Sequence, residues 1–247
     1  MTKIPFYVKK SEKPMSVGIF LSGSGTNFTA VAEYQIKSGI KDTDISFVFS
    51  NVPGCPGIKK AEDYGIKTYS LSSKQFFADL GLSPDDEKGR NSYDSKVLDL
   101  LSEHHNTDLI VLAGYRRKLS PVFYDYFRDR IINMYPGDIT RDYLVTGVPA
   151  SLQAIRNKDS EIACTVYIDN KNTRFGEAIT RSVPVSLEGY SEDNVDELDR
   201  EIREKAEWTA LPYAVFEIIA KERLSLDDDG SLYIDDIILP PGGLQLK

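Results

Sequence analysis

The first part of the chain alternates between short apolar runs and stretches whose apolar residues recur with helical spacing. Val17 to Leu21 form an apolar run, which is typical of a buried parallel strand, and a glycine turn follows it. Phe28, Val31 and Ile36 then recur at the spacing of one helix face. Because this strand–helix order repeats, the pattern predicts a doubly wound α/β sheet. The predicted strands are 17–21, 44–51 and 66–71, and the predicted helices are 27–39 and 56–65.

A polar and charged stretch, residues 72–92, interrupts this alternation and predicts a surface insertion. The alternation then resumes with the most hydrophobic run of the chain, "DLIVLAGY". Ser120 is a predicted helix N-cap, and Pro121 suits the first position of that helix. The predicted helices here are 92–105 and 119–130, and the predicted strands are 108–115 and 130–134.

The pattern changes after Met134, where an irregular stretch precedes a helix and two β-branched strands. A long amphipathic helix follows, and Pro212 is expected to kink or split it. A hairpin with a DG-type turn and an irregular tail complete the chain. We expect a single domain over residues 1–247. The predicted parts are the helix 148–159, the strands 161–170 and 177–187, the helix 192–222, the hairpin 224–235, the tail 238–247, a sheet core over 16–186 and a C-terminal helix and hairpin over 192–247.

Composition narrows the classes of function. The formal net charge of -8 argues against binding nucleic acid through the overall field of the protein. Cys55 and Cys164 lie far apart without the spacing of a metal site, so no metal is expected. The N-terminus lacks the apolar segment of a signal peptide, and the apolar runs are too short to cross a bilayer. We therefore expect a cytoplasmic protein with no membrane partner.

The stretch "LSGSGTNF" is the first candidate for chemistry. A Gly-x-Gly turn between a strand and a helix gathers backbone N–H groups at the positive end of the helix, which can hold a phosphate. The third glycine of a dinucleotide motif would stand at Phe28, and the lysine of a P-loop is absent. The loop therefore indicates a small phosphorylated ligand, while a tight strand-to-helix turn remains an equally good interpretation.

Two further stretches follow predicted strands, at the sheet edge where ligands bind in open α/β sheets. In "AGYRRKLSP", residues 116–118 are three cations that could meet carboxylates, although they could also be the solvated start of a helix. In "INMYPGDITRD", Asn133 could donate a hydrogen bond to an oxyanion, and Asp138 and Asp142 lie in the loop beyond it. On spacing alone, an ordinary strand-to-loop exit is the favoured interpretation of this stretch. The adjacent His104 and His105 fall at the opposite edge, so imidazole catalysis is not expected.

In this order, these stretches resemble glycinamide ribonucleotide (GAR) formyltransferase, the folate-dependent enzyme of purine synthesis. "VGIFLSGSGTNF" is similar to the opening strand and phosphate loop of the family, and "VFSNVPGCPGIKKAEDYGIKT" to its second strand and helix. "YDSKVLDLLSEHHNTDLIVLAGYRRKLSPVFYDYFRDRIINMYP" is similar almost continuously. The likeness extends over about residues 16–222 and implies a Rossmann-like, mostly parallel sheet of the formyltransferase type.

The resemblance implies roles for particular residues. Asn133 stands at the position of the catalytic asparagine of the family, which polarises the formyl carbonyl. Arg117 and Leu119 would lie beside the pterin of 10-formyltetrahydrofolate, the implied formyl donor. The GAR phosphate and ribose would be held by Gly23, Ser24, Gly25, Thr26 and Asn27.

Two positions depart from the family. A histidine normally follows the asparagine by two residues, and Tyr135 stands there instead. Counting back from "VPV", Thr173 occupies the position of the family's catalytic aspartate, and neither Asn172 nor Arg174 in a shifted register restores an acid. Asp138 or Asp169 could supply a replacement carboxylate. The family's Ser-Leu-Leu-Pro after the histidine-proline is also replaced, by "GDIT".

These departures leave several functions open. Losing one acid–base group typically slows a reaction by about 100- to 10,000-fold. Tyr135 is a poor replacement for the histidine as a base, because the reference pKa of tyrosine is about 10. The favoured interpretation is formyl transfer to a phosphorylated amine such as GAR, through Asn133, Tyr135 and Asp138, with Asp169 and Thr173 on the folate side. The alternatives are a non-catalytic or regulatory ligand-binding homologue and a formyltransferase for another amine, such as a sugar nucleotide. Either a monomer or a homodimer is compatible with the sequence.

Overall fold

The computed structural model describes residues 3–128, 130–141, 143, 145, 147–171, 173 and 175–247. The chain divides into two compact units, which are described separately. The N-terminal unit contains residues 9–132 and 169–174, and the C-terminal unit contains residues 1–8, 133–168 and 175–247. The expectation of a single domain stays a prediction. Within the described part of the chain, no helix is long and apolar enough to span a membrane.

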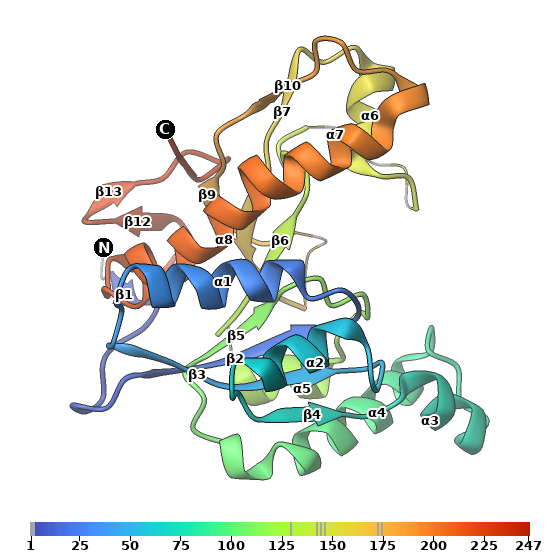
Figure 1. Cartoon of the computed structure of the whole chain (residues 1–247). Helices are drawn as coiled ribbons and strands as arrows, with labels where there is room; N and C mark the ends of the chain where they lie inside the picture. Colours follow the sequence, from blue (N-terminus) through green and yellow to red (C-terminus); the bar gives the residue numbers. More distant parts are fainter. Residues whose placement is uncertain are drawn as a thin grey trace. The chain divides into compact units, whose positions relative to one another are not determined.

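The N-terminal unit is built on parallel strands in the order β5-β2-β3-β4 (Figure 1). Strand β2 is flanked on both sides, so that Phe20 pairs in register with Phe49 on one neighbour and Leu112 on the other. Each strand coincides with a predicted apolar run, which confirms the sequence interpretation. The strands are β2 (Met15–Leu21), β3 (Thr43–Ser50), β4 (Thr68–Ser70) and β5 (Leu109–Leu112).

Helices cover both faces of these strands, as expected for a doubly wound sheet. On one face Phe20, Phe47 and Phe49 belong to a core cluster shared with residues of α3, α4 and α5. On the other face Leu21 packs against Gly57 of α2, which in turn contacts α1. The helices are α1 (Thr26–Lys37), α2 (Pro56–Asp63), α3 (Ser73–Leu80), α4 (Glu87–Leu100) and α5 (Pro121–Phe127), with a short 3₁₀ turn η1 (Ser102–His104) after α4.

The interpretation of residues 72–92 as a surface insertion is wrong for its aromatic residues. This stretch forms α3 and the beginning of α4, and the hydroxyl of Ser72 caps α3 by accepting from the N–H of Gln75. Phe77 is buried and stacks on Tyr93, with ring centroids 5.7 Å apart. Among the charged residues of α3, Phe76 and Phe77 form one apolar stripe, which is enough to attach this short helix to the core.

The C-terminal unit contributes strands in the order β14-β9-β8-β6. Strand β8 pairs antiparallel with β9, and β9 pairs parallel with β14. The tail was expected to be irregular, and this expectation is wrong for β14, which extends the sheet. The bounds are β6 (Ile131–Tyr135), β7 (Glu161–Ile162), β8 (Thr165–Ile168), β9 (Ala178–Arg181), β10 (Val185–Ser186) and β14 (Leu244–Gln245), with helix α6 (Ala150–Asn157) before β7.

The predicted long helix and hairpin are confirmed in the same unit. The helix continues through Pro212, with π-helical segments on both sides of the α-helical turn that contains it. The hairpin strands β11 and β12 pair antiparallel and join β1 and β13 in a small sheet. The bounds are η2 (Glu192–Asn194), α7 (Val195–Ile202), η3 (Arg203–Glu207), α8 (Trp208–Tyr213), η4 (Ala214–Ile219), β1 (Ile4–Pro5), β11 (Leu224–Leu226), β12 (Leu232–Ile234) and β13 (Ile237–Ile238).

Candidate functional site

The Gly-x-Gly loop connects β2 to the N-terminus of α1 in the N-terminal unit. Gly25 is the N-cap residue of α1, and its φ of 68° lies in the left-handed region that favours glycine. The first turn of α1 contains no acidic residue, and among the described residues no side chain caps it. The helix therefore presents its first N–H groups without a competing carboxylate, which is the arrangement that binds a phosphate.

A second glycine, Gly57 in the first turn of α2, holds this loop. The N–H of Gly57 donates to the carbonyl of Gly23 at 2.9 Å. A Cβ added to Gly25 would lie 2.5 Å from the Cα of Gly57, so the two backbones touch. A Cβ on Gly23, by contrast, would meet nothing within 4 Å. Gly25 is thus required for packing, whereas Gly23 faces open space.

Side chains from the neighbouring strands fix the beginning of the loop. The hydroxyl of Ser22 donates to Oδ1 of Asn51 at 2.6 Å, and it accepts from the N–H of Arg116 at 2.9 Å. Ser22, Asn51 and Arg116 follow β2, β3 and β5, so the loop is tied at the carboxyl ends of three strands. Ser24 is exposed at the tip of the loop, and Asn27 is buried in the first turn of α1.

Arg117 is held by aromatic rings. Its guanidinium carbon lies 4.6 Å from the ring centroid of Phe77 and 4.5 Å from that of Tyr93. Asp94 is buried nearby, and burial raises its pKa although the N–H of Ser120 donates to it at 2.6 Å. The side chain of Leu119 lies in the same core cluster. The segment 116–120 is therefore rigidly supported, with Arg117 as a fixed cation.

Asp169 and Thr173 also belong to the N-terminal unit. The hydroxyl of Tyr124 donates to Oδ1 of Asp169 at 2.9 Å. The N–H and hydroxyl of Thr173 donate to Oδ1 of Asn170 at 3.2 and 3.1 Å, which closes a local turn. Asn172 and Arg174, the alternative positions for the acid of the family, lie outside the described residues.

Asn133 and Tyr135 occupy the end of β6, in the C-terminal unit. Oδ1 of Asn133 accepts from the N–H of Met134 at 2.8 Å, so its amide nitrogen is directed elsewhere as a donor. The ring of Tyr135 packs on Phe175, with centroids 4.8 Å apart. A Cβ on Gly137 would lie 2.7 Å from Cε1 of Tyr135, so the glycine after Pro136 is required by this packing.

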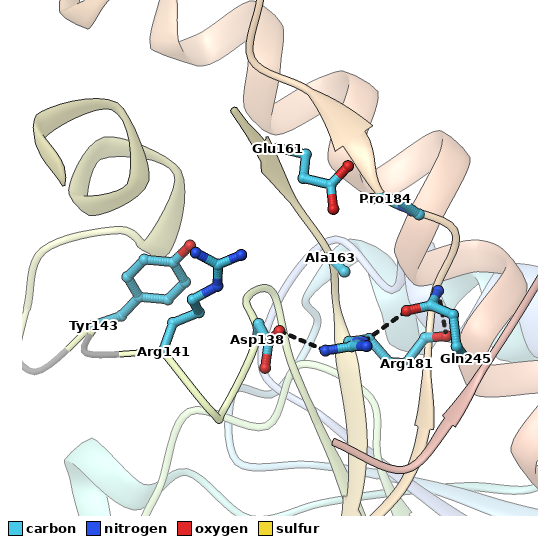
Figure 2. A pocket seen from close by; sticks show the side chains of 8 residues that line it. All are labelled: Asp138, Arg141, Tyr143, Glu161, Ala163, Arg181, Pro184 and Gln245. Atoms are coloured by element: carbon cyan, nitrogen blue, oxygen red, sulfur yellow. Dashed lines mark hydrogen bonds and ion pairs between the residues drawn. The ribbon is translucent and has the colours of Figure 1, made fainter. Parts of the chain in front are cut away.

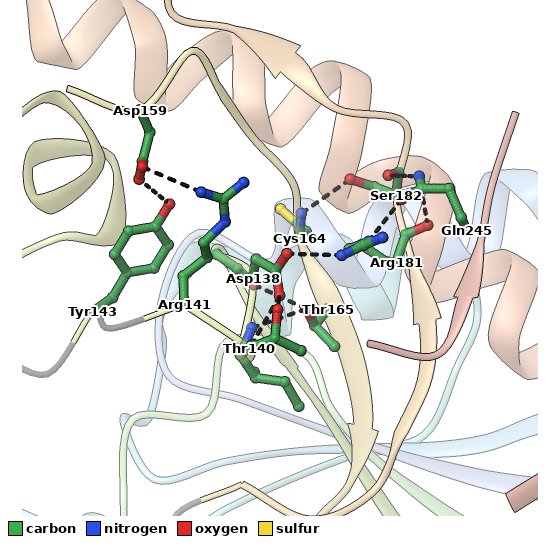
Figure 3. Close-up of polar contacts among 12 residues, drawn as sticks. Asp138, Thr140, Arg141, Tyr143, Asp159, Cys164, Thr165, Arg181, Ser182 and Gln245 are labelled. Atoms are coloured by element: carbon green, nitrogen blue, oxygen red, sulfur yellow. Dashed lines mark hydrogen bonds and ion pairs between the residues drawn. The ribbon is translucent and has the colours of Figure 1, made fainter. Parts of the chain in front are cut away.

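The loop after β6 borders a cavity of about 160 Å³ in the C-terminal unit (Figure 2). Asp138 in this loop is buried, and both oxygens of its carboxylate accept hydrogen bonds (Figure 3). Oδ1 accepts from the N–H and hydroxyl of Thr140 at 2.8 and 2.5 Å, and Oδ2 accepts from Nη1 of Arg181 at 2.9 Å. Burial alone would raise the pKa of Asp138, but Thr140 and Arg181 outweigh it, so the pKa lies below its ordinary value.

Asp138 is therefore a well-anchored anion and a weak base. The contacts with Thr140 and Arg181 indicate that it supports the loop, and its catalytic role stays a prediction. Asp142, the other acid predicted for this loop, lies outside the described residues. Across the described ranges, no group of three or more His, Cys, Asp or Glu residues could hold a metal ion.

The structure groups the predicted residues by unit. Gly23 to Asn27 form one loop of the N-terminal unit, which also contains Arg117, Leu119, Asp169 and Thr173, whereas Asn133, Tyr135 and Asp138 share the β6 segment of the C-terminal unit. The sequence interpretation did not identify the residues that hold these groups in place. A glycine directly after a helix-starting proline was the available signal for Gly57, and no local signal marked Asn51, Arg181 or Gln245.

Comparison with known proteins assigns the chain to a family. The family described as formyl transferase matches residues 15–215. The chain belongs to the formyl transferase family. The phosphoribosylglycinamide formyltransferase of Escherichia coli (strain K12) is 26% identical over 229 residues, which cover 93% of this chain and 98% of that protein.

Other relatives agree with this assignment. The trifunctional purine biosynthetic protein adenosine-3 of Drosophila melanogaster is 30% identical over 83% of this formyl transferase chain, which spans only 14% of that longer protein. The crystal structure of a phosphoribosylglycinamide formyltransferase from Anaplasma phagocytophilum is 26% identical, with a TM-score of 0.72 over 95% of this chain and 100% of that one. A Coxiella burnetii structure of the same name, at 24% identity and a TM-score of 0.75 over 95% and 100% of the two chains, confirms the fold.

Proposed function

We propose that this protein transfers a formyl group from 10-formyltetrahydrofolate to the primary amine of glycinamide ribonucleotide. The observation that carries the proposal is the loop from Gly23 to Asn27, whose shape is fixed by Gly57 and whose helix N-terminus carries no acid. Such a loop suits a phosphorylated substrate. Membership of the formyl transferase family and the named activity of the relatives support the reaction class.

The reaction moves a formyl group between two nitrogens. The substrate amine attacks the formyl carbon, a new C–N bond forms, and the bond from that carbon to N10 of the folate breaks. The amine loses a proton, and the released folate nitrogen gains one. Negative charge develops on the formyl oxygen during attack, so a hydrogen-bond donor placed there accelerates the reaction.

Asn133 is the donor that we propose for this oxygen. Its Oδ1 accepts from the N–H of Met134, and its amide nitrogen is the atom that can donate to an oxyanion. The hydroxyl of Tyr135 is a second donor on the same strand and takes the place of the histidine of the family. In this proposal Asp138 keeps the loop in shape, and proton removal is left to solvent or the substrate, so slow turnover is expected.

Residues of the N-terminal unit provide the proposed binding groups for the formyl donor. Folates are anionic, and Arg117 is a cation whose guanidinium contacts the rings of Phe77 and Tyr93. Its buried Nε has no hydrogen-bond partner among the described residues, so stacking rather than a hydrogen-bonded carboxylate holds it. The folate would lie beside Arg117 and the backbone of Leu119, with Asp169 and Thr173 as further contacts.

The test is formyl transfer by the purified full chain with glycinamide ribonucleotide and 10-formyltetrahydrofolate. We expect measurable turnover, and Asn133→Ala should lower kcat by about 100- to 1,000-fold, as removal of an oxyanion donor does. Asn106→Ala removes the same amide from an exposed loop position and should change kcat by less than about twofold.

Thermal unfolding with each substrate separates binding from catalysis. A rise in Tm with glycinamide ribonucleotide but no turnover would show a binding protein rather than an enzyme. If neither turnover nor a Tm shift occurs, the proposed substrate is wrong. The absence of both turnover and a Tm shift would favour another phosphorylated amine, such as a sugar nucleotide, as the substrate.

A further inference from the structure

The cavity in the C-terminal unit is lined by charged groups that the proposed reaction does not use. It lies between the loop after β6, the beginning of β7, and the segment from β9 to Pro184 (Figure 2). Its volume of about 160 Å³ is below the roughly 300–1,000 Å³ of pockets for drug-sized ligands, so it suits a molecule of only a few heavy atoms. The lining residues are Asp138, Arg141, Tyr143, Glu161, Ala163, Arg181, Pro184 and Gln245.

Two of the four charged side chains neutralise each other. Asp138 and Arg181 form an ion pair of 2.9 Å, and the carboxylate is only 9% exposed. Gln245 of β14 fixes the guanidinium by accepting from its Nε at 2.7 Å. The amide nitrogen of Gln245 donates in turn to the carbonyl of Ser182 at 2.6 Å. This side of the cavity is a rigid, internally neutral wall.

The other two charged side chains also face the cavity: Glu161 has no ion pair among the described residues, and Arg141 keeps N–H groups beyond the one that it directs to Asp159. Nη1 of Arg141 is 3.3 Å from Asp159, whose other oxygen already accepts from the hydroxyl of Tyr143 at 2.8 Å. The guanidinium of Arg141 is about half exposed, and its remaining N–H groups border the cavity. Glu161 directs its carboxylate toward the cavity from β7, and within the described residues it forms no ion pair.

We propose that this cavity binds a small zwitterion of amino-acid size. The ammonium group would meet Glu161, and the carboxylate would meet Arg141. A simple anion would be attracted by Arg141 but repelled by Glu161 and by Asp159, the partner of Arg141, whereas a simple cation would leave the remaining N–H groups of Arg141 without an acceptor. A ligand that carries both charges satisfies both residues, and charge-assisted hydrogen bonds are the strong ones. The site is distinct from the phosphate loop, so the proposal does not depend on formyl transfer.

The test is isothermal titration calorimetry on the full chain with glycine, β-alanine and 4-aminobutyrate. These probes carry the same two charges at increasing separation, whereas acetate and methylammonium carry one charge each. We expect one of the zwitterions to bind with a Kd at least tenfold lower than that of either single-charge molecule. Binding of acetate or methylammonium as tight as that of every zwitterion, or no binding of any zwitterion, would overturn the proposal.

Variants connect the binding to the two named residues. Glu161→Gln removes an unpaired charge from an exposed position and should keep the Tm of the parent, whereas Arg141→Gln also breaks the partly exposed ion pair with Asp159 and should lower the Tm by only about 2–4 °C. For the best zwitterion, each should raise the Kd by about tenfold or more. Glu188→Gln makes the same change at an exposed position of the same unit and should leave the Kd unaltered. Equal affinities in the Glu161→Gln and Glu188→Gln proteins would refute the assignment.

Discussion

The two glycines of the phosphate loop provide the sharpest test, because the same substitution should have opposite effects at each. Gly25→Ala places an alanine at φ 68°, in the left-handed region that disfavours residues with a Cβ. The new Cβ would also lie 2.5 Å from the Cα of Gly57. Gly23→Ala adds a Cβ that meets nothing within 4 Å. The first change should therefore damage the fold, and the second should damage only ligand binding.

The magnitudes follow from these contacts. Left-handed backbone costs a non-glycine residue roughly 1–2 kcal/mol, and overpacking against a backbone adds about 1–3 kcal/mol. Gly25→Ala should thus lower the free energy of unfolding by about 2–5 kcal/mol. At roughly 2–4 °C per kcal/mol for a chain of this size, the Tm falls by on the order of 10 °C. For Gly23→Ala, a less flexible unfolded chain offsets small costs, and the Tm should move by only about 2–4 °C.

Binding should show the reverse order. In the proposed complex the backbone at Gly23 lies against the substrate phosphate, so a methyl group there obstructs close approach. Loss of one charge-assisted hydrogen bond is worth about 1.5–3 kcal/mol, and the KM for glycinamide ribonucleotide should rise by about tenfold to a hundredfold.

Differential scanning calorimetry and steady-state kinetics on both variants measure the two effects. The packing argument fails if Gly25→Ala keeps the parental Tm. An unchanged KM in a folded Gly23→Ala protein would mean that the phosphate does not bind at this loop.

Three further predictions concern the other site residues. Because the pKa of Asp138 is lowered in the folded state, Asp138→Asn should cost about 1–3 kcal/mol of unfolding free energy above about pH 4, and urea unfolding should show this difference vanish as the pH falls through the lowered pKa. Arg117→Lys loses the guanidinium contact with two rings and should cost about 1 kcal/mol in the same measurement, whereas Arg116→Lys at an exposed position should cost nothing. The double variant Tyr135→His with Thr173→Asp restores the acid–base pair of the family and should raise the rate of formyl transfer by about 100-fold or more; a rate no higher than that of the parent would show that these two positions do not limit catalysis.

The apolar runs were sufficient to predict the parallel strands, because a strand buried on both faces has a distinctive composition. The Gly-x-Gly turn likewise indicated both its place between β2 and α1 and its suitability for a phosphate. Residues 72–92 show the limit of this reasoning. Phe77 and the partly buried Phe76 attach α3 to the core, and two adjacent aromatic residues among charges carry little periodic signal.

The supports of the candidate site could not be predicted, since they depend on contacts between distant parts of the sequence. Gly57 touches the phosphate loop from more than thirty positions away, and Arg181 reaches Asp138 across a similar separation. The pairing of β14 with β9 also joins distant parts of the sequence. It was missed because a two-residue strand after "LPPGG" has no hydrophobic pattern of its own. Such contacts become visible only when the topology is known.

The docking of the C-terminal strand has a practical consequence for work with this protein. Gln245 fixes Arg181, Arg181 fixes Asp138, and Asp138 shapes the turn that follows Tyr135. An affinity tag or fluorescent protein joined after Lys247 would be separated from Gln245 by only two residues, and a displacement of β14 by the tag would disturb the turn through these contacts. Fusions at the other end of the chain avoid that strand, so they are the safer choice for kinetic measurements.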